Sequence, residues 1–332
     1  MLVRIGDFHK VWYKMRQGLG FDHRRVLAGQ QEKVSSAWSH TSYPRKNWGA
    51  LPRIAEHWNG LIGDTVSEDF RDFIARTHLP QGNAKAISIA CGTGTNELKW
   101  ARTGAFSSIH AFDVSEPRIA KAREVAATVR LDHIVEFSVA SFDDLASFGT
   151  GFGVVIAENA LHHAVDLDRT VEACSRVLRN DGFLILKDYV GPDRFQWTNI
   201  QVAHANRILK TIPPAYRTRW NVRTVKNRIY RTGTLLNRLI DPSEAAASSR
   251  IPDVLSRYFE QTLLVPLGGT LLQPVFDDIA HNFQETDDTA MEIVQACIAR
   301  EQRLIETGTI PSDFVFAIYR KTEASQTPPG CP

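Results

Sequence analysis

The sequence has few cysteines, and no two of them are close together in the chain. The four are scattered and form no Cys-x-x-Cys motif; they are Cys91, Cys174, Cys297 and Cys331. A zinc site or disulfide framework is therefore not expected, and a reducing cytoplasm fits this usage best. No apolar run approaches the roughly 18 residues needed to span a bilayer, and the first residues lack the apolar core of a signal peptide. We expect a cytoplasmic protein without a resident metal.

Acidic residues are absent from one long segment. Between Arg194 and Ile240 there is no Asp or Glu but ten Arg or Lys, although the whole chain has a formal net charge of only +2. This excess can attract a phosphate-bearing molecule, an anionic lipid surface or a nucleic acid. It can equally belong to a solvated helical lid that acids elsewhere balance. Interleaved aromatic residues suit sugar and base stacking alike, so these alternatives stay open.

The pattern of apolar residues indicates an α/β fold. The chain has 332 residues, 43% of them hydrophobic, which allows one large α/β domain with additions or two small domains. Short β-branched segments alternate with helical patterns, which predicts right-handed βαβ crossovers and a parallel sheet. A turn signal at Asn180-Asp181-Gly182 is expected to separate a helix from the fifth strand. The expected strands cover residues 86–90, 108–112, 134–139, 152–157, 183–187, 258–267 and 314–319.

The first of these strands runs into a glycine turn and then directly into a helix. Gly92 and Gly94 can adopt backbone conformations closed to other residues. A dinucleotide dehydrogenase would need a third glycine for close helix–strand packing, but Glu97 stands there. Asp113 closes the second strand 19 residues after Gly94 and can accept hydrogen bonds from both hydroxyls of a ribose. These residues suit an adenosine cofactor without choosing which one.

Taken together, these landmarks resemble the class I S-adenosylmethionine-dependent methyltransferases. The resemblance covers residues 83–191, and a segment at 191–197 is similar to a bacterial subset that acts on small molecules or sugars. It implies a Rossmann-like fold with a mostly parallel seven-stranded sheet, helices on both faces and a helical lid insertion. The matching pieces are Ala90–Gly94, Asp113, Ala140–Asp143, Glu158–His163 and Val177–Phe183.

The resemblance also implies roles for particular residues. Gly92 and Gly94 would approach the methionine part of S-adenosylmethionine, Asp113 would hold the ribose, and Val114 would lie against the adenine. The alternative for Asp113 is a helix N-cap. Asp143 is slightly preferred to Asp144 as the contact to the adenine edge. The full set of expected cofactor contacts is Ala90, Cys91, Gly92, Thr93, Gly94, Asp113, Val114, Ser141, Phe142, Asp143, Glu158 and Asn159.

Methyl transfer needs alignment and, for a hydroxyl acceptor, a base. His162 and His163 follow the fourth strand and titrate near neutral pH; His163 is weakly favoured, and the alternative is that both are structural. Asp188 and Tyr189, after the fifth strand, are the other candidates. We expect O-methylation of a small or carbohydrate-like acceptor, which can be phosphorylated, with release of S-adenosylhomocysteine.

Other functions remain as competing hypotheses. The Asn/Asp-Pro-Pro-aromatic motif of base-amine methyltransferases is absent after strand four, and Ile212-Pro213-Pro214-Ala215-Tyr216 lacks its leading residue. The rivals are an RNA or nucleic-acid methyltransferase that uses the basic segment, and a catalytically silent cofactor-binding partner protein. Peripheral membrane contact stays open, as does the oligomeric state. The expected units are an N-terminal segment 1–60, a cofactor-binding core 61–192, a basic helical lid 193–257, a C-terminal part 258–322 and a disordered tail 323–332.

Overall fold

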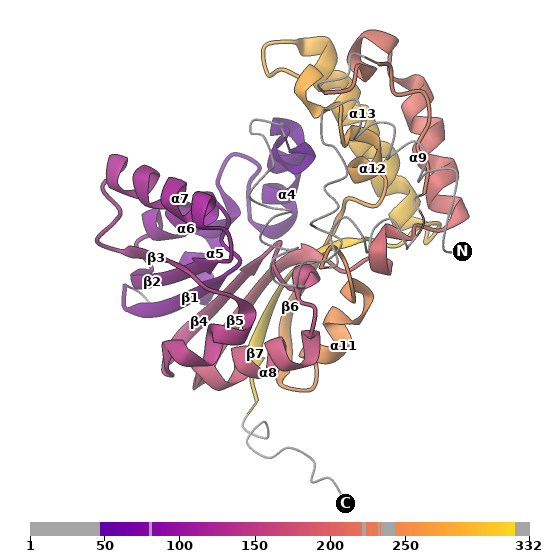
Figure 1. Ribbon diagram of the computed structural model, residues 1–332. Helices are drawn as coiled ribbons and strands as arrows, with labels where there is room; N and C mark the ends of the chain where they lie inside the picture. The colour runs from indigo at the N-terminus through magenta and orange to yellow at the C-terminus, as the bar shows by residue number, and fades with distance from the viewer. Residues whose placement is uncertain (1–46, 80–81, 221–223, 232, 234–242, 323–332) are drawn as a thin grey trace, which may run out of the picture.

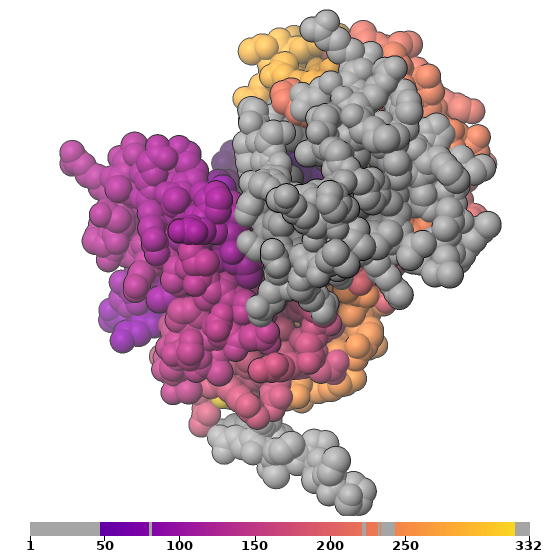
Figure 2. Space-filling model, viewed as in Figure 1, coloured from indigo at the N-terminus to yellow at the C-terminus, as the bar shows by residue number. Residues whose placement is uncertain are grey.

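The computed structural model describes residues 47–79, 82–220, 224–231, 233 and 243–322. Most of the N-terminal segment 1–60, parts of the basic segment and the whole of the tail 323–332 lie outside the described residues. The two ends of the fold are formed by α7 (Glu116–Thr128) on one side and by α9 (Asn199–Thr211) with α13 (Asp288–Glu306) on the other (Figures 1 and 2). Among the described helices, none combines the length and apolar character required to cross a membrane.

A seven-stranded sheet in the order β3-β2-β1-β4-β5-β7-β6 forms the centre of the molecule. β7 is antiparallel to both of its neighbours, and the other pairs are parallel. This confirms the expected Rossmann-like, mostly parallel sheet. The strands are β1 (Ala84–Ile89), β2 (Phe106–Asp113), β3 (Val135–Val139), β4 (Phe152–Glu158), β5 (Leu178–Tyr189), β6 (Phe259–Gly268) and β7 (Phe314–Lys321).

Alternate residues along the central strands feed two separate hydrophobic cores. Ile109 and Val154 belong to the core beneath α4–α7, whereas Ile87 and Val155 belong to the core beneath α8 and α11. Both faces of the sheet are thus covered, as a parallel sheet requires. The other α-helices of the described residues are α4 (Pro52–Ile62), α5 (Phe70–His78), α6 (Thr95–Arg102), α8 (Leu167–Val177), α11 (Ile251–Leu255) and α12 (Leu272–Phe276).

The sheet order creates a switch point between β1 and β4. The chain leaves β1 toward β2 and leaves β4 toward β5, so the loops at the carboxyl ends of these two neighbours diverge. Ala90, just beyond β1, and Asn159, just beyond β4, both have left-handed backbone conformations, with φ of 52° and 54°. Ligands of open α/β sheets bind in the crevice at such a point.

The turn expected at Asn180–Gly182 is wrong in its placement. α8 ends at Val177 and β5 begins at Leu178, so the three residues lie inside the strand. Leu178 pairs with Phe152 while Phe183 already pairs with Val154, which means that the extra residues of β5 form a bulge. A bulge absorbs unpaired residues at the end of a ladder while pairing continues beyond it.

The segment 193–257 is helical only in part. α9 and α11 confirm the helical pattern, but the described residues between 218 and 231 are not helical, and Thr218 forms an isolated antiparallel bridge with Val225. Basic side chains hold this stretch in place. Lys226 is buried, and its Nζ donates to the carbonyl oxygens of Pro274 at 2.9 Å and of two further residues. Arg219 pairs with Asp278 at 3.0 Å.

Candidate active site

The glycine turn after β1 is shaped by close packing. Gly94 has φ of 74° and caps α6, and a Cβ atom there would lie 2.5 Å from the ring of Phe137 on β3. Gly92 has φ of 57°, and among the described residues a Cβ atom there would meet only the Arg118 guanidinium within 4 Å, at 3.6 Å. The lack of a side chain at Gly94 therefore lets the turn pack closely against the sheet, while the space beside Gly92 can admit a ligand. Thr93 between them is half-buried.

Asp113 joins the ends of β1 and β2. Its Oδ2 accepts a hydrogen bond from the Gly92 N–H at 3.0 Å, and its Oδ1 accepts one from the Ser115 N–H at 2.9 Å. The side chain is buried, and the N-cap of α7 is Ser115 rather than Asp113. Each carboxylate oxygen can accept a further hydrogen bond. Val114, beside it in the chain, is half-buried.

The turn after β3 separates the roles of two neighbouring aspartates. Ser141 and Asp144 form a capping box in which Oδ2 of Asp144 accepts from the Ser141 N–H and hydroxyl, each at 2.8 Å. Asp143 has a half-exposed side chain that pairs with Arg169 at 3.2 Å. Phe142 packs edge-on against Phe112 of β2. Asp144 is therefore committed to holding the turn, which favours Asp143 as the ligand contact.

Cys91, in the glycine turn, is partly buried. Its backbone N–H donates to the Phe112 carbonyl at 3.0 Å, which fixes the chain as it leaves β1. Burial raises the pKa of the Cys91 thiol well above its usual value, and the nearby carboxylates add to this effect. The thiolate needed for nucleophilic chemistry is thus suppressed, and only the shape and backbone of this residue remain to contact a ligand.

The carboxylate of Glu158 does not serve as expected. It is buried in an ion pair with Arg71 of α5, with Nη2–Oε2 at 2.6 Å and Nε–Oε1 at 3.0 Å, and it also accepts from Trp100 Nε1 at 2.7 Å. These partners direct it toward α5 and α6, so only the backbone of Glu158 remains for ligand contact. Asn159 follows with an exposed side chain, and its N–H donates to the Lys187 carbonyl at 2.7 Å.

Asp188 organises the loop that carries the two histidines. Its carboxylate is fully buried, and Oδ2 accepts from the backbone N–H groups of Ala160 at 3.2 Å and Leu161 at 2.7 Å. Its Oδ1 lies 2.5 Å from Nδ1 of His162. The proton of neutral His162 therefore sits on Nδ1, and Nε2 carries the lone pair.

The structure brings Asp188 to His162 and not to His163, the histidine favoured from the sequence. The rings of the two histidines lie against each other with centroids 3.8 Å apart. Burial lowers the pKa of His163 well below its usual value, and the neighbouring His162 adds to this effect. Of the two histidines, His162 is therefore the one whose ring is oriented by a carboxylate, as a general base requires.

Glu244 completes this group and was not anticipated from the sequence. Its Oε1 lies 4.0 Å from Nε2 of His162, and its Oε2 lies 3.8 Å from Nδ1 of His163. It stands in the segment before α11, far along the chain from both histidines. No motif marks it, because only the fold of the insertion brings it here.

The surroundings of Tyr189 do not favour it as a base. Its side chain is 1% exposed, and its hydroxyl donates to the Pro192 carbonyl at 3.0 Å. Burial raises the pKa of Tyr189 far above the range in which a phenolate forms near neutral pH. Its ring packs against Phe195 and Phe314 instead, which indicates a role in joining the sheet to the segment after β5.

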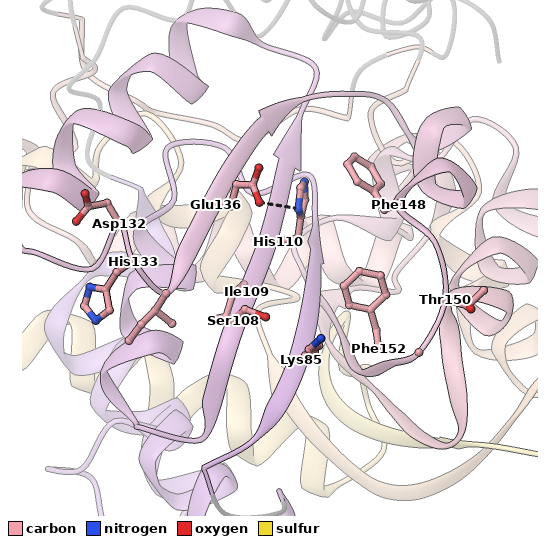
Figure 3. Close-up of a pocket in the computed structure, with 12 residues that line it drawn as sticks. Lys85, Ser108, Ile109, His110, Asp132, His133, Glu136, Phe148, Thr150 and Phe152 are labelled. Carbon is pink, nitrogen blue, oxygen red and sulfur yellow. Dashed lines mark ion pairs between the residues drawn. The ribbon is translucent and has the colours of Figure 1, made fainter.

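A hollow lies on the side of the sheet where the strands begin. It has a volume of about 740 Å³ and is lined by residues near the starts of the strands, among them Lys85, His110, Phe148 and Phe152 (Figure 3). His110 faces Glu136 there, with Nδ1–Oε2 at 3.4 Å. None of the expected site residues line it, so the hollow is separate from the carboxyl-end site.

Comparisons with known proteins point to methyltransferases. Residues 87–186 match the family described as a methyltransferase domain. A ubiquinone biosynthesis O-methyltransferase from Mesorhizobium japonicum is 27% identical over 162 residues, which cover 48% of this chain and 63% of the relative. The chain thus spans somewhat less than two thirds of that relative's length.

Solved structures show the same fold. A geranyl diphosphate C-methyltransferase from Streptomyces coelicolor A3(2) aligns with a TM-score of 0.51 at 13% identity, covering 90% of this chain and 99% of that one. A cyclopropane synthase from Mycobacterium tuberculosis aligns with a TM-score of 0.50 at 14% identity, covering 89% and 99%. The fold is that of the class I methyltransferases. Residues 87–186 thus match a methyltransferase domain, a family whose methyl donor is S-adenosylmethionine.

Proposed function

We propose that this protein transfers a methyl group from S-adenosylmethionine to an oxygen of a small-molecule or carbohydrate-like acceptor, releasing S-adenosylhomocysteine. The observation that carries the proposal is the contact between His162 and Asp188 beyond β4 and β5. β4 is the direct neighbour of β1, which carries the glycine turn. A methyl donor at that turn and an acceptor beside His162 would therefore share one edge of the sheet.

The cofactor would be held chiefly by the first two loops. Gly92 and Gly94 bring the backbone of the turn, with Ala90, Cys91 and Thr93, close to the methionine part. The Asp113 carboxylate accepts one backbone hydrogen bond on each oxygen and has remaining lone pairs for two ribose hydroxyls. Backbone donors on both sides hold this carboxylate in place before the cofactor arrives, which reduces the ordering cost of binding.

The adenine would lie between the loops after β2 and β3. Val114 would contact its face, and Ser141, Phe142 and Asp143 would surround its edge. The commitment of Asp144 to the capping box supports Asp143 as the polar contact. The backbone of Glu158 and Asn159 would border the methionine part and the acceptor from β4.

His162 would take the proton of the acceptor. The bound cofactor supplies an electrophilic methyl group, and transfer then depends mainly on alignment, worth several kcal/mol. Nε2 of His162 would accept the hydroxyl proton, and the Asp188 carboxylate on Nδ1 would stabilise the resulting imidazolium. A base in this position contributes about 10²–10⁴-fold to the rate.

The acceptor class is proposed from two observations. The curated relative reported above is named as an O-methyltransferase, and a base beside the site suits a hydroxyl. Basic side chains of the insertion such as Lys226, Arg219 and Arg231 bind carbonyl, carboxylate and amide oxygens within the fold. The use of these cations inside the fold gives no support to a phosphate track for nucleic acid.

Calorimetry with S-adenosylhomocysteine tests the cofactor site. The wild-type chain should bind it, and Asp113→Ala should weaken binding by about 100-fold, because two charged hydrogen bonds would be lost. Asp132→Ala, which changes an exposed aspartate outside the site, should leave the affinity unchanged. Binding of NAD in place of S-adenosylhomocysteine would overturn the proposal.

Transfer of a labelled methyl group to a panel of phenols and polyhydroxylated compounds tests the base. His162→Gln should lower kcat by about 10²–10⁴-fold while S-adenosylhomocysteine affinity is retained. Tyr189→Phe, which removes only a hydroxyl bound to a backbone carbonyl, should keep most of the activity. Equal turnover in His162→Gln and wild type would exclude His162 as the base.

A further inference from the structure

Three metal-binding side chains converge beyond β4. One ligand atom each from His162, His163 and Glu244 can be chosen so that all lie within 4.8 Å of one another. The closest approaches of the carboxylate are 4.0 Å to Nε2 of His162 and 3.8 Å to Nδ1 of His163. Ligands at about 2.1 Å from a tetrahedral Zn²⁺ lie about 3.4 Å apart. Small side-chain rotations would therefore be enough to bring these atoms onto one cation.

The surroundings of His162 match those of a metal-bound histidine. Metal-binding histidines commonly donate their second ring N–H to a carboxylate, which fixes the tautomer and makes the coordinating nitrogen more basic. Asp188 occupies this position on Nδ1 of His162, 2.5 Å away. Asp188 is itself held by backbone N–H groups, so the coordinating direction of Nε2 is set by the fold.

Burial and charge also favour a cation at this position. His162 is buried, and the side chains of His163 and Glu244 are 15% and 29% exposed, so the group is shielded from solvent but accessible. Two carboxylates, Asp188 and Glu244, supply negative charge. The Arg118 guanidinium is near enough to lower the pKa of His163 and would oppose a cation. Among the described groups named here, two carboxylates face one guanidinium.

We propose that His162, His163 and Glu244 form a binding site for a divalent transition-metal cation. Two imidazoles and one carboxylate suit Zn²⁺, Fe²⁺, Co²⁺ and Mn²⁺ and leave coordination positions open. The proposed role rests on the function given above, because an acceptor hydroxyl would take an open position. Coordination would lower the pKa of that hydroxyl, and its proton would pass to solvent.

A cation and a proton cannot both occupy Nε2 of His162. Occupancy of the site therefore decides how the acceptor hydroxyl loses its proton. In the metal-free protein, His162 accepts the proton. In the metal-loaded protein, coordination acidifies the hydroxyl, and His162 serves as a ligand with Asp188 behind it.

Titration of the untagged full chain with ZnCl₂ and MnCl₂, after EDTA treatment and desalting, tests the site by calorimetry. One equivalent of at least one cation should bind, and Co²⁺ should give a visible absorption band. His163→Gln and Glu244→Gln should each weaken binding by about tenfold or more. His204→Gln, at a half-buried histidine on α9, should not change it.

Two further measurements separate this inference from the methyltransferase proposal. Asp113→Ala should lose S-adenosylhomocysteine binding and keep the cation, while Glu244→Gln should do the reverse, which also shows that both variants are folded. Absence of binding up to millimolar concentrations, or affinities that are unchanged in His163→Gln and Glu244→Gln, would overturn the metal site. A protein that transfers methyl groups but binds none of the tested cations would overturn this inference and leave the methyltransferase proposal standing.

Discussion

The buried pair between Arg71 and Glu158 offers the sharpest test of how this fold is stabilised. Both residues are almost fully inaccessible, at 3% and 6% exposed. Arg71 also donates to Asp69 at 3.0 Å and to Asn96 at 2.8 Å, and Trp100 donates to Glu158. The pair therefore links α5 and α6 to the end of β4, where the site begins.

Removing one charge of this pair should destabilise the protein strongly. Breaking a buried ion pair costs about 3–5 kcal/mol, because the remaining charge stays buried without its partner. Glu158→Gln keeps the shape, and Asp69 still contacts Arg71, so we expect about 3 kcal/mol and a fall in melting temperature of about 6 °C. Arg53 and Glu56 form an exposed pair at 2.9 Å, so Glu56→Gln should change stability by less than about 1 kcal/mol.

Urea and thermal unfolding of Glu158→Gln, Arg71→Met and the double variant measure these changes in the free energy of unfolding. The double variant should be less destabilised than the sum of the single variants, with a coupling of about 1–3 kcal/mol. A cost for Glu158→Gln no larger than that of Glu56→Gln would refute the reasoning. Additive single effects would show that the two side chains do not depend on each other.

Three further outcomes are expected. Burial raises the pKa of Glu97 to about 7, so the stability contributed by its protonated form is complete below the unfolded-state pKa and is lost as pH rises through about 7. The urea concentration at the midpoint of unfolding should therefore decrease when the pH is raised from about 5 to about 8. Glu97→Gln should flatten this dependence. Gly94→Ala would place a Cβ 2.5 Å from an aromatic ring and should weaken S-adenosylhomocysteine binding at least about tenfold, whereas Gly104→Ala, at φ of 72° with open space around it, should leave the calorimetric affinity unchanged. Lys226→Met removes the ammonium shared by three carbonyls and should lower the free energy of unfolding by about 2 kcal/mol, while the exposed Lys210→Met should have almost no effect.

The sequence predicted the order and type of most strands and helices because these depend on local periodicity. The main errors of the sequence-based prediction lie where long-range packing decides the secondary structure. Asn180–Gly182 has turn residues, but the ladder with β4 draws them into a strand as a bulge. The stretch around Lys226 has a helical composition, yet its described residues are not helical, and the Lys226 side chain binds the end of α12.

By itself, the sequence determined the class of fold and the placement of the glycine turn and of Asp113 at strand ends, because each is specified within a few residues of a strand end. The tertiary structure alone decided which histidine meets Asp188, that Arg71 occupies the Glu158 carboxylate, and that Glu244 joins the site. These contacts join residues that are distant in the chain. Hydrogen-bond geometry across the sheet selects them, and no local pattern records that geometry.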